Sequence, residues 1–175
     1  MAELDRRKTV IYVHPNIHPS SATLKMEIAG FYIEFLFDTT RAITNLVFAG
    51  TVHRYPHIRW IFSHAGGTIP FITWRLSLAD HNPLMQDKIP GGVAAHLKSL
   101  YYDTALAFSK PPMQALLEFV EPSHVLYDSD FPYAPEFLVA GEISELKKLD
   151  LIDEKTRRMI FRENALALIP RLAGR

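Results

Sequence analysis

The sequence predicts an α/β fold with a parallel sheet, and three short apolar runs carry this prediction. Each run is rich in β-branched or aromatic residues and ends on a histidine or an aspartate: residues 10–13 before His14, 60–63 before His64, and 125–129 before Asp130. A run of this kind that then turns at Pro or Gly is typical of a buried strand. Parallel α/β enzymes place their chemistry at the ends of such strands.

The first third of the chain is predicted to form a βαβ unit. A strand at residues 10–13 is followed by a loop and by an aromatic stretch at residues 31–37. Asp38 is predicted to cap a helix that runs to about Arg54. The apolar residues of this helix are spaced to bury one face: Ile43, Leu46, Val47 and Val52. Since the second strand, residues 58–63, follows at once, the two strands are expected to be parallel and joined in the right-handed sense.

The rest of the chain continues the alternation of strands and helices. The predicted elements are a helix over residues 69–78, a strand over 100–103, a helix from Pro111 to about 120, a strand over 125–129, and helices over 136–149 and 154–169. The expected order is therefore β-α-β-α-β-α-β-α-α, which is typical of consecutive βα units.

The composition describes one globular domain and excludes several classes of protein. The 175 residues, 48% of them hydrophobic, suffice for a single domain spanning residues 1–175. Nineteen basic residues balance nineteen acidic ones, so we expect no nucleic-acid or membrane partner. Any metal must be held by His, Asp or Glu, because the chain has no cysteine. No stretch has the character of a signal peptide or a membrane span, and we expect a cytoplasmic protein.

The three strand ends are the candidate site. If the strands are parallel neighbours, His14, His64 and Asp130 converge on one mouth of the sheet, with each strand alternating its side chains between two faces. Imidazole and carboxylate are the ligands that Zn or Mn takes when thiolate is absent. A histidine that is not a ligand can act as an acid or base beside the metal. Taken singly, a His or Asp at a strand end is more often a capping or hydrogen-bonding residue.

Six motifs along the chain occur together: His14-Pro15, Phe37-Asp38-Thr39-Thr40-Arg41-Ala42, Ser63-His64-Ala65-Gly66-Gly67, Tyr102-Asp103-Thr104-Ala105, Ser129-Asp130-Phe131-Pro132 and Asn164-Ala165. Jointly these motifs resemble the amidohydrolase-2 group of the amidohydrolase superfamily. They cover nearly the whole chain. The group includes aminocarboxymuconate-semialdehyde, resorcylate and methylsalicylate decarboxylases.

The resemblance implies a parallel (β/α) barrel of the TIM type, of which this chain is the C-terminal half, strands five to eight. It implies that His14 and Asp130 are metal ligands, at the ends of the fifth and eighth strands, with Zn or Mn as the metal. It implies that His64, after the sixth strand, is the catalytic acid/base, and that Asp130 or His64 protonates the carbon that loses carbon dioxide. The substrate implied is a small carboxylated ring or a ring-derived acid. Arg75 is expected to bind a substrate carboxylate or to form a structural ion pair.

One departure from the family pattern concerns the metal ligands. The family's first strand carries a His-x-His or Glu-x-His pair, and neither pair occurs in this sequence. We therefore expect a homo-oligomer or a partner that supplies the missing half-barrel. A further expectation concerns Asp128, one layer below Asp130, because a buried carboxylate is costly unless a polar group of a neighbouring strand pairs with it.

Three functions remain open at this stage. The leading one is a metal-dependent decarboxylase, a carbon-carbon lyase. The second is a hydrolase or lactonase on the same scaffold, because a metal-activated hydroxide with a histidine base suits ester opening equally well. The third is a catalytically incompetent chain that acts only in assembly.

Overall fold

Four strands form one parallel sheet in the order β1-β2-β3-β4 in the computed structural model, which describes residues 1–174. Their bounds are β1 (Val10–Val13), β2 (Arg59–Phe62), β3 (Tyr101–Asp103) and β4 (Val125–Leu126). Strands that follow one another in sequence are neighbours in the sheet, as consecutive βα units require. The predicted parallel α/β fold is confirmed.

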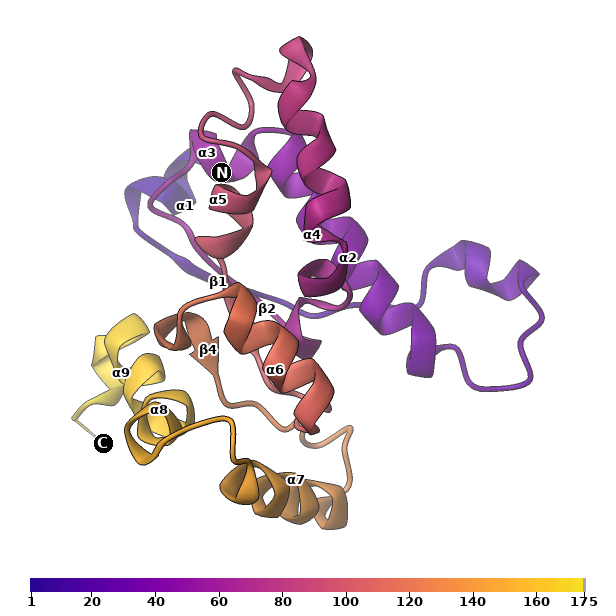
Figure 1. Ribbon diagram of the computed structural model, residues 1–175, viewed down its shortest axis with the longest axis vertical. Helices are drawn as coiled ribbons and strands as arrows, with labels where there is room; N and C mark the ends of the chain where they lie inside the picture. Colours follow the sequence, from indigo (N-terminus) through magenta and orange to yellow (C-terminus); the bar gives the residue numbers. More distant parts are fainter. Residues whose placement is uncertain (175) are drawn as a thin grey trace.

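Nine α-helices connect and flank these strands within residues 1–174 (Figure 1). They are α1 (Ala2–Arg6), α2 (Phe31–Phe48), α3 (Thr51–Arg54), α4 (Ile69–Leu76), α5 (Val93–Lys98), α6 (Lys110–Phe119), α7 (Glu136–Lys148), α8 (Glu154–Arg158) and α9 (Asn164–Leu168). A π-helical turn, Met159–Glu163, joins α8 to α9. In this described part of the chain, no helix has the length and apolar character that crossing a membrane requires.

The start of α2 differs from the prediction. The helix begins at Phe31, so the aromatic stretch forms its first two turns, and Asp38 lies in its middle instead of at its cap. The carboxylate of Asp38 accepts the N–H of Asn16 at 2.9 Å and so ties α2 to the loop that follows β1. Figure 1 shows that the rest of this loop reaches away from the body of the molecule before it returns to α2. The prediction that Asp38 caps the helix is therefore wrong, because its carboxylate is bonded to the preceding loop.

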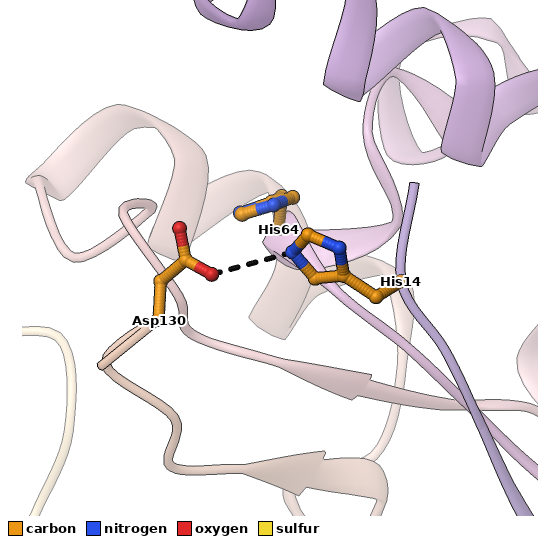
Figure 2. A group of neighbouring side chains, drawn as sticks. All are labelled: His14, His64 and Asp130. Atoms are coloured by element: carbon orange, nitrogen blue, oxygen red, sulfur yellow. Dashed lines mark hydrogen bonds and ion pairs between the residues drawn. The ribbon is translucent and has the colours of Figure 1, made fainter. Parts of the chain in front are cut away.

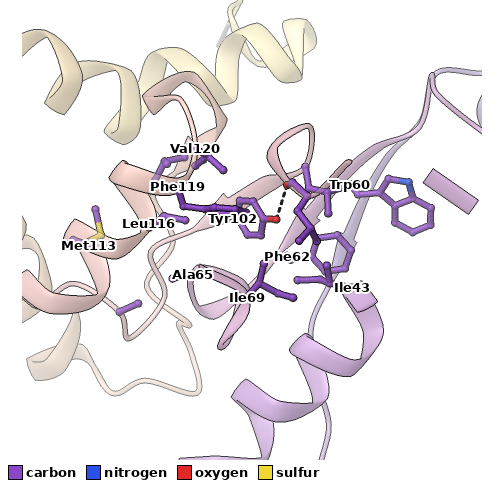
Figure 3. Packing of buried hydrophobic residues seen from close by; sticks show 14 of the residues in the cluster. Ile43, Trp60, Phe62, Ala65, Ile69, Tyr102, Met113, Leu116, Phe119 and Val120 are labelled. Carbon is purple, nitrogen blue, oxygen red and sulfur yellow. Dashed lines mark hydrogen bonds between the residues drawn. The ribbon is translucent and has the colours of Figure 1, made fainter. Parts of the chain in front are cut away.

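The face of the sheet that meets the helices carries the main apolar core (Figure 3). Phe62 and Tyr102 are completely buried there, and the Tyr102 hydroxyl donates to the carbonyl of Leu97 at 2.7 Å. The helices contribute further buried residues: Ile43, Ile69, Leu97, Met113 and Leu116. Burying one such side chain contributes about 1.5–3 kcal/mol, so this face dominates the stability of the fold.

The opposite face of the sheet carries apolar and polar side chains at the same levels, since Ile61 pairs with Tyr12 and Leu126 with Asp103. Ile61 and Leu126 pack there against Leu168 of α9. The guanidinium of Arg59 donates to the carbonyls of Leu168, at 3.0 Å, and of Lys8, at 2.7 Å. The C-terminal helix α9 thus packs on the apolar residues of this face, and the polar side chains of the same face are described below.

The last strand is shorter than predicted because its continuation leaves the sheet ladder. Beyond Leu126, the N–H of Tyr127 donates at 2.9 Å to the carbonyl of Ile160 in the π-helical turn. The next N–H, of Asp128, donates to the hydroxyl of Thr104 at 3.2 Å. The amide of Asn164 donates to the carbonyl of Val125 at 2.7 Å. The segment that leads to Asp130 is therefore attached to the C-terminal helices as well as to β3.

Candidate metal centre

Three side chains meet at the carboxyl edge of the sheet: His14 after β1, His64 after β2 and Asp130 after β4 (Figure 2). One ligand atom from each residue lies within 4.8 Å of the other two. The Nε2 atom of His14 is 3.3 Å from Oδ1 of Asp130, and the rings of His14 and His64 are 5.3 Å apart between centroids. The fold thus brings together the three residues that the sequence singled out, while their chemical roles stay predictions.

The route by which His64 reaches this mouth differs from the expected alternation of side chains. Val13 pairs with Phe62, so His14 is level with Ser63, and Phe62 faces the helices. Simple alternation along β2 would turn His64 toward the helices as well. His64 and Ala65 instead adopt left-handed backbone conformations, with φ of 56° and 55°. This break in the strand redirects the imidazole into the mouth.

The imidazole of His64 is held by one of its nitrogens and leaves the other free. Its Nδ1 lies 3.0 Å from the carbonyl of Ala105, and because a carbonyl only accepts, Nδ1 carries the proton in the neutral ring. Its Nε2 is buried and has no hydrogen-bond partner among the described residues. A buried lone pair without a partner fits a cation or a proton that is to be transferred.

The donor set fits a divalent cation. The side chain of Asp130 is only 9% exposed, and that of His14 is 34% exposed. A carboxylate with so little exposure is costly unless a positive charge lies close to it. Two imidazole nitrogens and a carboxylate oxygen form a ligand set that Zn²⁺ and Mn²⁺ both accept.

Aromatic rings border the site on two sides. Phe35 of α2 lies 5.5 Å from the ring of His14 and 6.0 Å from that of His64, measured between centroids. Tyr133, three residues beyond Asp130, stacks on His14 at 6.4 Å. Rings in such positions favour offset stacking or edge-to-face contact with another aromatic group. The surroundings of the three residues therefore suit a flat, ring-containing ligand.

A polar network with one buried member, Asp103, lies directly below the site. Asp103 at the end of β3 is completely buried, and its carboxylate accepts the hydroxyl of Tyr12. The same hydroxyl lies 2.7 Å from the carboxylate of Asp128. Burial raises the pKa of Asp103 to about 7, and burial together with the negative charge of Asp103 raises the pKa of Tyr12. Asp128 thus lies beside a polar group, as expected, but Tyr12 comes from β1 rather than from the adjacent strand, and its single proton is shared between Asp128 and Asp103.

The sequence reasoning did not assign a role to Asp103 or Tyr12. The available signal was that the third strand ends on an aspartate, as the others end on His14, His64 and Asp130. Arg75, which was expected in an ion pair or at a substrate carboxylate, is exposed on α4 and forms no ion pair within residues 1–174. The structural alternative for Arg75 is therefore not realised.

A second buried carboxyl group comes from α7. Glu142 is completely buried, and one of its oxygens accepts the N–H of Leu106 at 3.2 Å. Its other oxygen has no partner in the described part of the chain. Burial raises the pKa of Glu142 to about 7, and the negative charges of the aspartates near the mouth act in the same direction.

Comparison with known proteins identifies the family. The sequence profile of the family described as amidohydrolase (Amidohydro_2) matches residues 1–171. The chain belongs to the amidohydrolase family. The 6-methylsalicylic acid decarboxylase of Penicillium expansum is 33% identical over 178 residues, which cover 99% of this chain and 53% of that protein. The chain thus spans about half the length of the curated relatives that it matches.

Solved structures give the same result for the fold. A crystal structure described as amidohydrolase II superposes with a TM-score of 0.84 at 27% identity, covering 97% of this chain and 54% of that one. A dihydroxybenzoic acid decarboxylase of Polaromonas sp. JS666, with bound manganese and 2-nitroresorcinol, has a TM-score of 0.79 at 20% identity over 95% of this chain and 51% of that one. The fold is therefore that of part of an amidohydrolase barrel.

Proposed function

We propose that this chain belongs to a metal-dependent decarboxylase that acts on a small aromatic or ring-derived carboxylic acid. The observation that carries the proposal is the convergence of His14, His64 and Asp130, with an unpartnered buried nitrogen on His64. The kinship with a 6-methylsalicylic acid decarboxylase supports the reaction. The aromatic rings of Phe35 and Tyr133 beside the site support the substrate class.

His14 and Asp130 are the proposed metal ligands, and Zn²⁺ or Mn²⁺ is the proposed metal. The manganese in the dihydroxybenzoic acid decarboxylase supports this choice. When bound, a divalent cation supplies a Lewis acid that orients and polarises a carboxylate or a neighbouring hydroxyl. The small exposure of Asp130 keeps water away from this ligand and strengthens its attraction for the cation.

His64 is the proposed acid/base. The Nδ1–H bond to the carbonyl of Ala105 fixes the ring so that Nε2 points into the mouth. In the reaction, the bond between the ring carbon and the carboxylate breaks, carbon dioxide leaves, and the ring carbon takes a proton. His64 or Asp130 delivers that proton, since both lie at the mouth. Phe35 holds the ring of the substrate close to the two histidines.

The direct test is carbon dioxide release from a panel of hydroxybenzoates, including 6-methylsalicylate, with Zn²⁺ or Mn²⁺ added. We expect release from at least one member, and a loss of about 10²–10⁴-fold in the variants His64→Ala and Asp130→Asn. The matched control is Asp150→Asn, an exposed carboxylate that pairs with Lys110. No release from any panel member with either metal counts against the proposal.

A metal-binding measurement separates the two roles that His64 can take. If His64 is an acid/base, His64→Ala binds Mn²⁺ nearly as tightly as the unchanged chain, whereas His14→Ala loses affinity. If His64 is a third ligand, both variants lose affinity to a similar degree. Isothermal titration with Mn²⁺ alone distinguishes the two results without any turnover.

Two alternatives to a decarboxylase remain, and assays of turnover and of metal content distinguish them. A lactonase would open lactones in the presence of metal and release no carbon dioxide. A chain that acts only in assembly would bind metal far below one equivalent, because His14 and Asp130 alone are few ligands for a tight site. Elemental analysis at about one metal per chain would exclude this alternative.

The partners of the chain follow from its sheet. Within residues 1–174, β1 pairs only with β2 and β4 only with β3. Such edges are templates for further strands. We propose that they pair with another half-barrel or with a second copy of the chain, and that a small carboxylated molecule binds at the completed mouth. Light scattering of the purified chain measures the size of the assembly.

A further inference from the structure

Both oxygens of the Asp103 carboxylate accept hydrogen bonds, and two of the three bonds hold His64 in place. Asp103 is completely buried, and its Oδ1 accepts two backbone N–H groups, from His64 at 2.8 Å and from Ala105 at 3.0 Å. Its Oδ2 accepts the hydroxyl of Tyr12. A buried carboxylate is tolerated only when its oxygens are bonded in this way.

Both backbone groups that Oδ1 binds are groups that hold His64. The first is the N–H of His64, a residue whose left-handed backbone, φ 56°, is costly for any side chain with a Cβ. The second belongs to Ala105, whose carbonyl accepts the Nδ1 proton of His64. A single carboxylate oxygen therefore fixes the backbone of His64 and also the acceptor for its ring.

The contact with Tyr12 braces this arrangement across the sheet. Tyr12 precedes the proposed ligand His14 by two residues, and its hydroxyl also reaches Asp128, two residues before Asp130. The network therefore connects the three chain segments that carry the site residues. A displacement of Asp103 would move His64 first, because Asp103 bonds directly to the backbone N–H of His64.

We propose that Asp103, braced by Tyr12, is a positioning residue that keeps His64 in its Nδ1–H tautomer with Nε2 directed at the site. The role in catalysis rests on the proposed decarboxylase function, whereas the positioning itself does not. Asp103 touches no reacting atom in this scheme and acts only through His64.

Nitrogen NMR of the imidazoles in the full chain, without metal, tests the positioning directly. At about pH 8.5, roughly two units above the ordinary histidine pKa, the rings are neutral and each tautomer has a distinct pattern. His64→Ala assigns the signal. We expect the Nδ1–H tautomer alone in the unchanged chain, both tautomers in Asp103→Ala, and a smaller admixture in Tyr12→Phe, which loses only the brace.

Two further variants separate positioning from general stability. Asp103→Asn keeps an oxygen that accepts both N–H groups, so we expect it to retain the single tautomer. Asp80→Ala is the matched control, because Asp80 likewise accepts a backbone N–H, from Val93 at 2.8 Å, at a different loop. If Asp103→Ala does not fold, Tyr12→Phe and Asp103→Asn still decide the matter. An unchanged tautomer in Asp103→Ala or in Tyr12→Phe, or its loss in Asp103→Asn, overturns the proposal.

Turnover gives an independent readout. If the chain releases carbon dioxide, Asp103→Ala should lower kcat by about 10–100-fold with little change in KM, and Asp103→Asn should restore most of the rate. If no substrate is decarboxylated, the proposed function fails, while the tautomer result still confirms or overturns the role of Asp103. The two failures are thus distinguishable.

Discussion

The helix-facing side of the sheet presents Phe62, Tyr102 and Val125, all completely buried among apolar neighbours, whereas the other side includes a polar group formed by Tyr12, Asp103 and Asp128. The same strands supply both sides, and in β3 an apolar-face residue is directly followed by a polar-face residue. Tyr102 packs in the core and Asp103 supports His64. Because side chains alternate along a strand, β3 supplies Tyr102 to the core and the next residue, Asp103, to the support of His64.

The two faces also differ in how they satisfy burial. The helix-facing side needs only shape and apolar area, with the Tyr102 hydroxyl bonded to Leu97 as a local exception. The polar side buries oxygens that need hydrogen bonds, and at Asp103 it supplies them with two backbone groups and a hydroxyl. Mutations on the two sides should therefore change different measurable quantities.

The largest expected effect separates the rate from stability. His64→Ala should lower the rate of carbon dioxide release by roughly 10²–10⁴-fold. It should lower the free energy of unfolding by about 1–3 kcal/mol, since it loses the hydrogen bond to Ala105 and the packing of a buried ring. Kinetics and urea denaturation of the same preparation measure both quantities. If His64→Ala loses its rate because a large fraction of the chain is unfolded, the distinction between the two faces is contradicted.

On the apolar side, Phe62→Ala should lower the free energy of unfolding by about 3–5 kcal/mol, because it leaves a cavity in a completely buried region. Urea denaturation followed by circular dichroism measures this loss. Leu84→Ala is the control, since Leu84 is 79% exposed and its removal should change stability by about 0.5 kcal/mol or less. A change below about 1 kcal/mol in Phe62→Ala would contradict the assignment of the core.

The polar side should make stability depend on pH. Burial raises the pKa of Glu142 from 4.5 to about 7. Between these two pH values the carboxyl group keeps its proton in the folded chain and has lost it in the unfolded chain. The stabilisation from Glu142 is full below about pH 4.5 and is lost as the pH rises through 7, by on the order of 3 kcal/mol. Asp103 acts in the same direction over the same range.

The contribution of Glu142 is isolated by comparison with Glu142→Gln. The variant should show a flatter fall in unfolding free energy between about pH 4.5 and 7 than the unchanged chain. Glu145→Gln, an exposed residue paired with Lys148, should leave the slope unaltered. Equal slopes in the unchanged chain and in Glu142→Gln would show that the buried carboxyl group does not carry this dependence.

The smallest expected effect concerns the polar exception within the apolar face. Tyr102→Phe removes the hydroxyl that donates to Leu97 and should lower the free energy of unfolding by about 0.5–1.5 kcal/mol. Tyr32→Phe, at a residue 64% exposed, should have almost no effect. A loss of several kcal/mol in Tyr102→Phe would mean that the polar contact matters more on this side than its apolar surroundings.

Several features could be predicted from the sequence because they depend on local patterns. Runs of β-branched and aromatic residues located β1, β2 and β3, and their spacing predicted a parallel sheet. Three of the predicted strands lead to His14, His64 and Asp130 at the same edge of the sheet. This pattern identified the residues that the fold brings together. These features follow from strand chemistry and from the direction of parallel strands.

Other features depend on contacts between distant residues and could not be found by pattern. Asp38 has the character of a helix cap, but its partner, Asn16, is decided by how the loop after β1 folds back. The left-handed turn at His64 contradicts the alternation that the strand predicts. The link from Tyr12 to Asp103 requires the register of three strands, which no local spacing fixes.

The π-helical turn Met159–Glu163 determines which parts of the molecule unfold together. Its Ile160 carbonyl receives the N–H of Tyr127, three residues before Asp130, and Asn164 binds the carbonyl of Val125. The C-terminal helices and the segment that bears Asp130 should therefore unfold together as one cooperative unit. A cation held at Asp130 would then slow hydrogen exchange in α9, although the candidate metal-binding group, His14, His64 and Asp130, includes no residue of that helix.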